Sequence, residues 1–197
     1  MVVENEVGPE DRLRADVYRL LAMLLRAAPD QTNLDMLATM RGDETPLGKA
    51  VGQLALLASK SSPDSIDVEY RALFIGIDKA EISPYGSSYM KDFLHESPLE
   101  RLRSDMSRAG IGMREDIDEP EDHIAALCEM MAGMILGDFA RPASLEDQRA
   151  FFKVHISAWA TTFFSDLQMA RSSVFYTGVG AVGAAFVTIE EAAFAMV

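Results

Sequence analysis

Apolar residues recur with the period of an α-helix along almost the whole chain, and this pattern restricts the fold more than any other feature. Leu13, Val17 and Leu20 share one such stripe behind Pro9, a favoured first-turn residue. Further periodic stretches follow helix-start signals at Thr45-Pro46, Ser62-Pro63, Ser97-Pro98 and Ser144-Leu145. No stretch alternates apolar and polar residues over the length of a strand with hairpin chemistry at its end. The sequence therefore predicts an all-α bundle of about nine or ten helices.

The charge balance and the apolar runs exclude several classes of partner. The 197 residues include 18 basic and 31 acidic side chains, a formal net charge of −13, which disfavours binding to nucleic acid or to an anionic membrane surface. The longest uncharged apolar run, Phe175–Ile189, is shorter than the roughly 20 residues of a membrane span. Cys128 is the lone cysteine, which excludes an internal disulfide, and we find no signal-peptide pattern. We expect a cytoplasmic protein without an integral membrane segment.

Two segments interrupt the helical pattern of what we expect to be a single domain, residues 1–197. Ile77–Ser88 contains Pro84, Gly86 and three serines, and is predicted to be a loop. Gly110–Pro120 contains acidic residues and is the expected place of an internal hinge, around residues 110–120. The acidic side chains there and just beyond the proline are Glu115, Asp116, Asp118, Glu119, Glu121 and Asp122.

The helix predicted after this acidic run is apolar nearly all round, because Ile124, Leu127, Cys128 and Met131 are joined by further methionines on the other side. Such a helix is buried rather than half-exposed. The segment Glu119–His123 then lies at its N-terminal end. We expect Asp122 and His123 in its first turn, where their side chains either cap backbone N–H groups or face a groove.

Several patterns in the sequence partly match catalytic or cofactor motifs, but each lacks an element that the chemistry requires. The string Gly178–Gly183 matches the dinucleotide fingerprint GxGxxG, but too few residues follow it for a second strand, so it predicts a small-residue face for close helix packing. The three histidines and Cys128 do not show the spacing of a four-ligand metal site, and no serine occupies a nucleophile elbow. His155 and Trp159 share one helix face, where a hydrogen-bonded core imidazole is expected. We predict no catalytic residue, no metal and no cofactor.

Four short strings, in order and in register, carry a resemblance to a known family. They are Tyr70-Arg71-Ala72-Leu73-Phe74, the stretch Ser83-Pro84-Tyr85-Gly86-Ser87-Ser88-Tyr89, the segment Glu119-Pro120-Glu121-Asp122-His123, and Phe152-x-x-His155-x-x-x-Trp159. Together with Tyr18-x-x-Leu21 they span residues 18–163. The chain resembles the TorD/DmsD-like chaperones of redox-enzyme maturation.

The resemblance implies an all-helical, TorD-like chaperone and not an enzyme. Its implied partners are the twin-arginine signal peptide and the apo-precursor of a molybdopterin-containing oxidoreductase, which it would hold back from export until the cofactor is inserted. The peptide-binding residues carried over from the family are Tyr70, Leu73, Phe74, Pro84, Tyr85, Glu119, Asp122 and His123. Tyr70 and Tyr85 stand where relatives often have tryptophan, so peptide preference can differ.

Physical chemistry agrees with this expectation. Two guanidinium groups followed by an apolar stretch call for carboxylates beside an apolar groove, and the net charge of −13 steers a cationic peptide toward the chain. Two alternatives stay open: a guanine-nucleotide-binding helical protein, although no phosphate loop is present, and a non-catalytic structural adaptor. The sequence leaves the client and the choice between a monomer and a domain-swapped dimer undecided.

Overall fold

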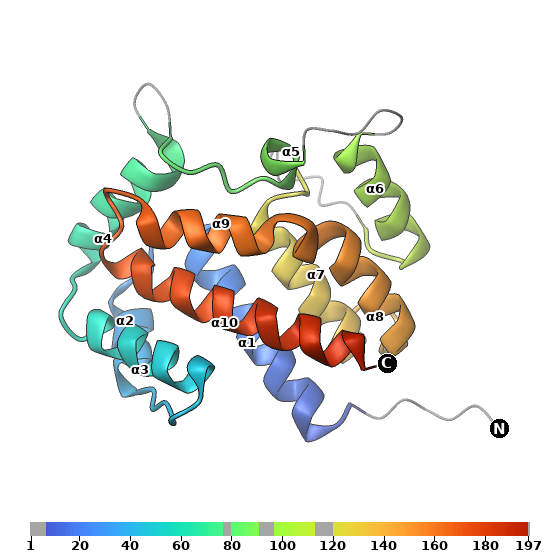
Figure 1. Ribbon diagram of the computed structural model, residues 1–197, viewed down its shortest axis with the longest axis horizontal. Helices are drawn as coiled ribbons and strands as arrows, with labels where there is room; N and C mark the ends of the chain where they lie inside the picture. The colour runs from blue at the N-terminus through green and yellow to red at the C-terminus, as the bar shows by residue number, and fades with distance from the viewer. Residues whose placement is uncertain (1–6, 77–79, 91–96, 113–119, 197) are drawn as a thin grey trace. The chain divides into compact units, whose positions relative to one another are not determined.

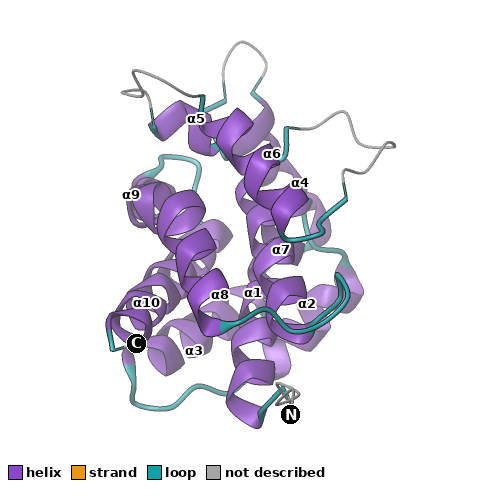
Figure 2. Cartoon of the chain, turned by 90° about the vertical axis from the view of Figure 1, so that its right-hand side faces the viewer, coloured by secondary structure: helices purple, strands orange, loops and turns teal. Residues whose placement is uncertain are grey.

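The computed structural model describes residues 7–76, 80–90, 97–112 and 120–196, and in these residues every regular element is helical (Figures 1 and 2). The all-α prediction is confirmed. The only strand-like feature among the described residues is one isolated backbone bridge between Tyr85 and His123.

The chain divides into two compact units. The first unit comprises Met1–Ala22, Tyr85–Trp159 and Phe194–Val197, and the second comprises Met23–Pro84 and Ala160–Ala193. Three of the four boundaries fall within helices, namely α1 (Pro9–Arg26), α9 (Ala158–Met169) and α10 (Phe175–Ala195), and the fourth lies between Pro84 and Tyr85. That the two units act as one domain remains a prediction, and residues 113–119 of the expected hinge lie outside the described residues.

The first unit is built around α7 (Ile124–Leu136). Ten of the 13 residues of α7 are buried, so it is a core helix, as its sequence predicts. Three further elements of this unit, α5 (Gly86–Tyr89), α6 (Pro98–Arg108) and α8 (Leu145–Phe152), precede the π-helical segment η2 (Lys153–Ser157). Gly137 ends α7 in the left-handed conformation, φ 85°, which glycine adopts without a steric penalty.

The second unit contains α2 (Gln31–Thr39), α3 (Pro46–Ala58), α4 (Pro63–Tyr70) and the π-helical segment η1 (Arg71–Ile75), with most of α9 and α10. The GxGxxG string lies inside α10, as expected for a packing face. A Cβ on Gly183 would lie 2.2 Å from the Phe164 ring, and one on Gly178 would lie 2.9 Å from Leu57. These glycines let the helix backbones approach closely, which excludes a dinucleotide role for the string.

The sequence-based element assignment needs two corrections. The segment predicted as a loop through Ser88 already forms α5 from Gly86 onward, because Asp122 supplies acceptors for the first backbone N–H groups of that turn. Asp122 and His123 precede the first turn of α7 instead of lying in it: His123 is the N-cap residue and Asp122 comes before it.

Candidate peptide-binding site

Seven of the eight predicted site residues lie in the described parts of the chain, and they are divided between the two units. Four belong to the second unit: Tyr70, Leu73, Phe74 and Pro84. Three belong to the first unit: Tyr85, Asp122 and His123. Glu119 lies outside the described residues. Each group is therefore described within its own unit.

In the first unit, the segment that begins at Tyr85 and the N-terminal end of α7 are joined by backbone and ring contacts. Tyr85 and His123 form the antiparallel bridge, and their rings meet edge to face with centroids 5.1 Å apart. The Gly86 N–H donates to the Asp122 carbonyl at 3.0 Å. Both segments contain predicted site residues, and the structure brings them into direct contact. We call this contact the Tyr85–His123 joint.

His123 caps α7 with its ring rather than with its backbone alone. Its Nδ1 accepts the Ala125 N–H at 3.1 Å, and the residue is only 2% exposed. A nitrogen that accepts a backbone N–H carries no proton, so the neutral ring bears its proton on Nε2. The imidazole thus stabilises the helix terminus and presents an edge to Tyr85, the half-exposed member of the joint.

Asp122 is buried, 2% exposed, and its two carboxylate oxygens differ. Oδ2 accepts the Ser87 N–H at 2.7 Å, which ties α5 to the end of α7. Oδ1 has no hydrogen-bond partner among the residues that the structure describes. A buried carboxylate oxygen without a donor is costly, and it leaves an acceptor for an incoming group.

Sequence reasoning did not include Glu121 in the site, although it lies beside Asp122. The Arg103 guanidinium on α6 donates to both Glu121 oxygens, at 3.0 to 3.2 Å. The Glu121 side chain is 14% exposed and that of Arg103 is 47% exposed. Glu121 raises the pKa of Arg103 by hydrogen bonding and by its charge. One carboxylate of the acidic run is thus already bound by an internal arginine, which the sequence does not reveal.

In the second unit, Tyr70 and Phe74 form an aromatic cluster with Tyr176 of α10. The ring centroids of Tyr70 and Phe74 are 5.0 Å apart, and Phe74 meets Tyr176 edge to face at 5.4 Å. The Tyr70 hydroxyl donates to the Arg26 carbonyl at 2.8 Å, so tyrosine at this position serves a structural contact. Leu73 is fully buried, whereas Tyr70 and Phe74 are half-buried and keep part of their surface accessible.

A buried carboxylate next to this cluster holds the start of α10. Glu69 accepts the backbone N–H groups of Val174, Phe175 and Tyr176 at 2.8 to 3.0 Å. These are donors that a helix N-terminus leaves unpaired, and negative charge is favoured there. Glu69 precedes Tyr70 in sequence, yet its role depends on a segment more than a hundred residues away, which no local pattern signals.

Exposed apolar side chains flank the Tyr70–Phe74 segment. Val68 is 69% exposed and Ile75 is 61% exposed, and Val174, whose amide binds Glu69, is 65% exposed. We use the name apolar strip for five side chains together: Val68, Ile75, Val174 and the accessible parts of Tyr70 and Phe74. Apolar side chains in water are the surface that an apolar peptide segment can cover.

Other candidate chemistry is not supported in the described residues. No group of three or more His, Cys, Asp or Glu side chains there could hold a metal ion. Cys128 is buried, and burial raises the pKa of its thiol to about 12, so it is unreactive at neutral pH. In the structure α10 is long and apolar enough to cross a membrane, but half of its most apolar window is buried inside the protein, as in the core helix of a globular protein.

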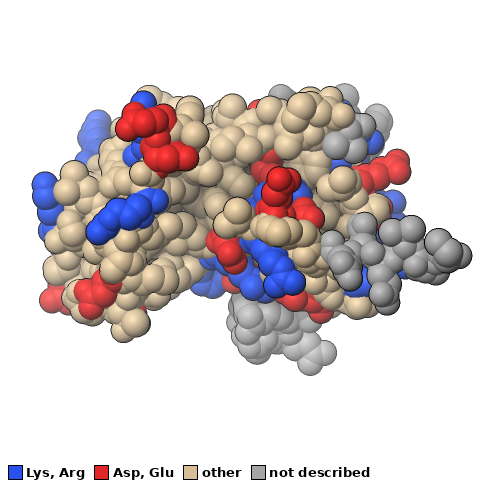
Figure 3. Space-filling model, turned by 90° about the horizontal axis from the view of Figure 1, so that it is seen from below, with Lys and Arg blue, Asp and Glu red and all other residues tan. Residues whose placement is uncertain are grey.

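The net charge of −13 is not spread as a uniform acidic surface. On the face shown in Figure 3, Lys and Arg side chains lie among the Asp and Glu side chains. The pair of Arg103 and Glu121 is an example of this local charge pairing.

In the described residues the fold is all-helical, and its first unit combines an aromatic contact with a buried, partly unpaired carboxylate. The profile of the family described as nitrate reductase delta subunit matches residues 41–165. The chain belongs to this family, which includes the TorD and DmsD chaperones. The predicted resemblance is confirmed, and the chain is a non-catalytic chaperone of redox-enzyme maturation.

Individual relatives agree with this assignment. The chaperone protein TorD of Photobacterium profundum is 27% identical over 188 residues, which cover 83% of this chain and 86% of TorD. The Tat proofreading chaperone DmsD of Haemophilus influenzae is 29% identical over 126 residues, 63% of this chain and 59% of DmsD. A redox enzyme maturation protein from Archaeoglobus fulgidus has the same fold, with a TM-score of 0.53, 19% identity and coverage of 91% and 94% of the two chains.

Proposed function

We propose that this chaperone acts in the cytoplasm, where it binds the twin-arginine signal peptide of an apo-molybdoenzyme precursor and prevents its export before cofactor insertion. The Tyr85–His123 joint is the observation that carries the proposal, because two of the family-like strings meet there around one buried carboxylate. The alternatives of a nucleotide-binding protein and a structural adaptor have no comparable observation in their favour.

The carboxylates at the joint suit an arginine-bearing peptide. Guanidinium groups bind carboxylates in a two-pronged geometry, and Arg103 shows it by donating from Nε to Oε1 and from Nη2 to Oε2 of Glu121. Because Arg103 is half-exposed, its ion pair with Glu121 contributes little to stability and can be exchanged. A peptide arginine exchanging with Arg103 on Glu121, next to the unpaired Oδ1 of Asp122, would meet two adjacent acceptors.

The apolar part of a signal peptide needs a different surface. The apolar strip of the second unit supports this role, because its chain segment carries exposed Val68 and Ile75 as well as the half-buried rings of Tyr70 and Phe74. Leu73, which is fully buried, would act by supporting that surface and not by touching the peptide.

Isothermal titration with a synthetic twin-arginine peptide tests the proposal, and the same peptide with both arginines changed to glutamine is the control. We expect the control peptide to bind at least about tenfold more weakly, and binding to weaken as sodium chloride rises from about 50 to about 300 mM. Equal affinity of the two peptides, or no binding of either, would contradict the proposal.

Two substitutions separate the roles within the charge pair. Arg103→Gln should strengthen peptide binding by about twofold to fivefold, because Arg103 no longer competes with the peptide arginine for Glu121. The gain is small because an exposed ion pair is weak. Glu121→Gln should weaken it, because an acceptor is lost. Changes of the same sign in both variants would show that the pair only stabilises the fold.

A further inference from the structure

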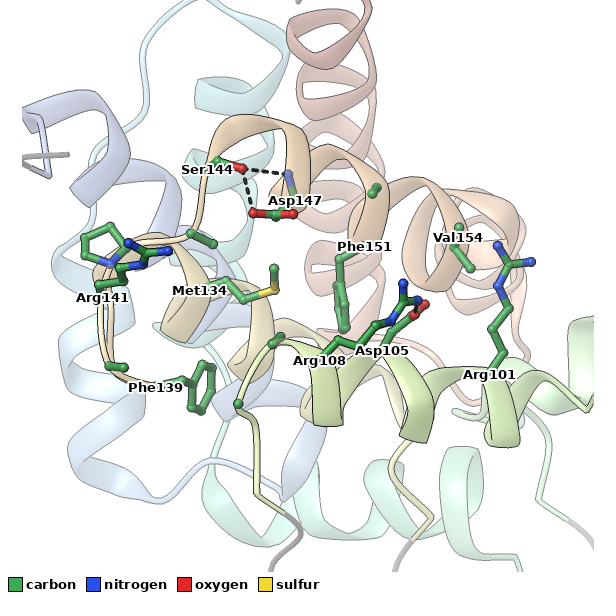
Figure 4. Close-up of a pocket in the computed structure, with 16 residues that line it drawn as sticks. Arg101, Asp105, Arg108, Met134, Phe139, Arg141, Ser144, Asp147, Phe151 and Val154 are labelled. Atoms are coloured by element: carbon green, nitrogen blue, oxygen red, sulfur yellow. Dashed lines mark hydrogen bonds and ion pairs between the residues drawn. The ribbon is translucent and has the colours of Figure 1, made fainter. Parts of the chain in front are cut away.

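A second binding surface lies in the first unit, on residues outside the predicted peptide-binding set. It is a groove with a volume of about 1290 Å³, bounded by α6, by the loop between α7 and α8, and by α8 with the start of η2 (Figure 4). In Figure 4, Arg141 and Arg101 lie at its two ends, and Met134, Phe139 and Phe151 lie between them.

The groove carries an unusual share of positive charge for an acidic chain. Three arginines line it, Arg101, Arg108 and Arg141, against two carboxylates, Asp105 and Asp147. Asp105 pairs with Arg108 and also accepts His155 Nε2–H at 2.7 Å, while Asp147 binds Ser144. Arg101 and Arg141 form no ion pair with any residue in the described parts of the chain, so two guanidinium groups are available there.

The middle of the groove is apolar and fixed in place. Phe139 packs on Gly133 of α7 so closely that a Cβ there would lie 2.5 Å from its ring. Phe151 is 4% exposed, and its ring contacts that of His155, with centroids 4.8 Å apart. Aromatic rings between separated cationic ends form a surface for a ligand that has apolar groups flanked by anions.

We propose that this groove binds an acidic segment of a partner polypeptide, with carboxylates spaced on either side of apolar residues. Its volume exceeds the roughly 300–1000 Å³ of small-molecule pockets. Arg101 and Arg108 lie seven residues apart on α6, or about 10 Å along the helix axis, a spacing that separate side-chain carboxylates can match. The arginines are spread along the groove and not gathered at one point, which suits separate carboxylates better than a compact polyanion such as pyrophosphate. The proposal does not rest on the binding of a twin-arginine peptide.

Fluorescence anisotropy with a labelled synthetic peptide, in which three glutamates alternate with Leu-Phe pairs, tests the inference on the full chain. We expect Arg101→Gln and Arg141→Gln each to weaken binding about threefold to tenfold. The matched control is Arg12→Gln, an exposed arginine of α1 outside the groove, for which we expect less than about a twofold change. Circular dichroism confirms that each variant is folded.

Each alternative outcome overturns the proposal. A peptide in which the three glutamates are replaced by glutamines could bind equally well. The groove would then recognise only the apolar residues of the peptide, with no contribution from its own arginines. If Arg101→Gln and Arg141→Gln match the Arg12→Gln control, binding occurs elsewhere. If inorganic pyrophosphate binds and the peptide does not, the arginines form a phosphate site. The twin-arginine titration is unaffected by these results, so the two proposals fail independently.

Discussion

Substituting Asp122 separates its structural bond from its proposed role in binding. Asp122→Ala removes the acceptor of the Ser87 N–H at 2.7 Å inside the protein. We expect it to lower the free energy of unfolding by about 2–3 kcal/mol, the scale of a charged hydrogen bond whose buried donor is left unpaired. Asp122→Asn keeps an oxygen for Ser87, and its amide nitrogen replaces the unpaired Oδ1. That variant should stay within about 1 kcal/mol of the wild type.

The affinity for the peptide should depend on the charge of residue 122 and not on the free energy of unfolding of the variant. Asp122→Asn should weaken binding of the twin-arginine peptide by about 1.5–3 kcal/mol, because a neutral amide no longer balances a guanidinium. Urea unfolding and isothermal titration measure the two quantities. Asp138→Asn is the matched control, since Asp138 is 51% exposed in a surface pair with Arg19 in the same unit. Wild-type affinity in Asp122→Asn would refute the binding role and leave Asp122 as a structural residue.

Three further predictions concern the fold. Glu69→Gln should lower the free energy of unfolding in urea by about 2–4 kcal/mol, because three backbone amides lose a charged acceptor; a loss below about 1 kcal/mol would contradict this. Gly183→Ala should destabilise by about 1–3 kcal/mol through overlap with Phe164, whereas Gly52→Ala, with open space around it, should stabilise by up to about 1 kcal/mol. Burial and nearby arginines lower the pKa of His155 to about 4. The unfolded chain therefore binds this proton more readily, and stability should fall as pH decreases from about 6.5 toward 4, by at most about 1.4 kcal/mol per pH unit. An NMR titration midpoint for His155 above its ordinary value would contradict the assignment.

The helical fold is predictable because its start signals are local. Thr45, Ser62, Ser97 and Ser144 each accept a backbone N–H from the residue three positions on, as their sequence context predicts. The π-helical segments η1 and η2 were not predicted. One extra residue in a turn leaves the apolar pattern almost unchanged, so periodicity cannot distinguish it from an ordinary helix.

The site was only partly predictable for the same reason. Asp122, His123 and Tyr85 were identified through short strings, and their mutual contact is now visible. The roles of Glu69 and Arg103 depend on pairings with residues far along the chain. A sequence gives the charge of such residues but not their partners. Glu121 is an example: the sequence shows it as one more carboxylate of the acidic run, whereas the structure shows that it is paired with Arg103.

Photo-crosslinking locates the peptide and so tests the central claim most directly. A twin-arginine peptide carrying benzoyl-phenylalanine just after the arginines would be irradiated with the protein, and mass spectrometry would identify the adducts. The account predicts adducts within residues 85–89 and 120–124 of the first unit. A second peptide, with the probe in its apolar stretch, should label the apolar strip around Tyr70 and Phe74. Adducts confined to the groove lined by Arg101, Arg108 and Arg141, or to surfaces away from both segments, would contradict the proposed site.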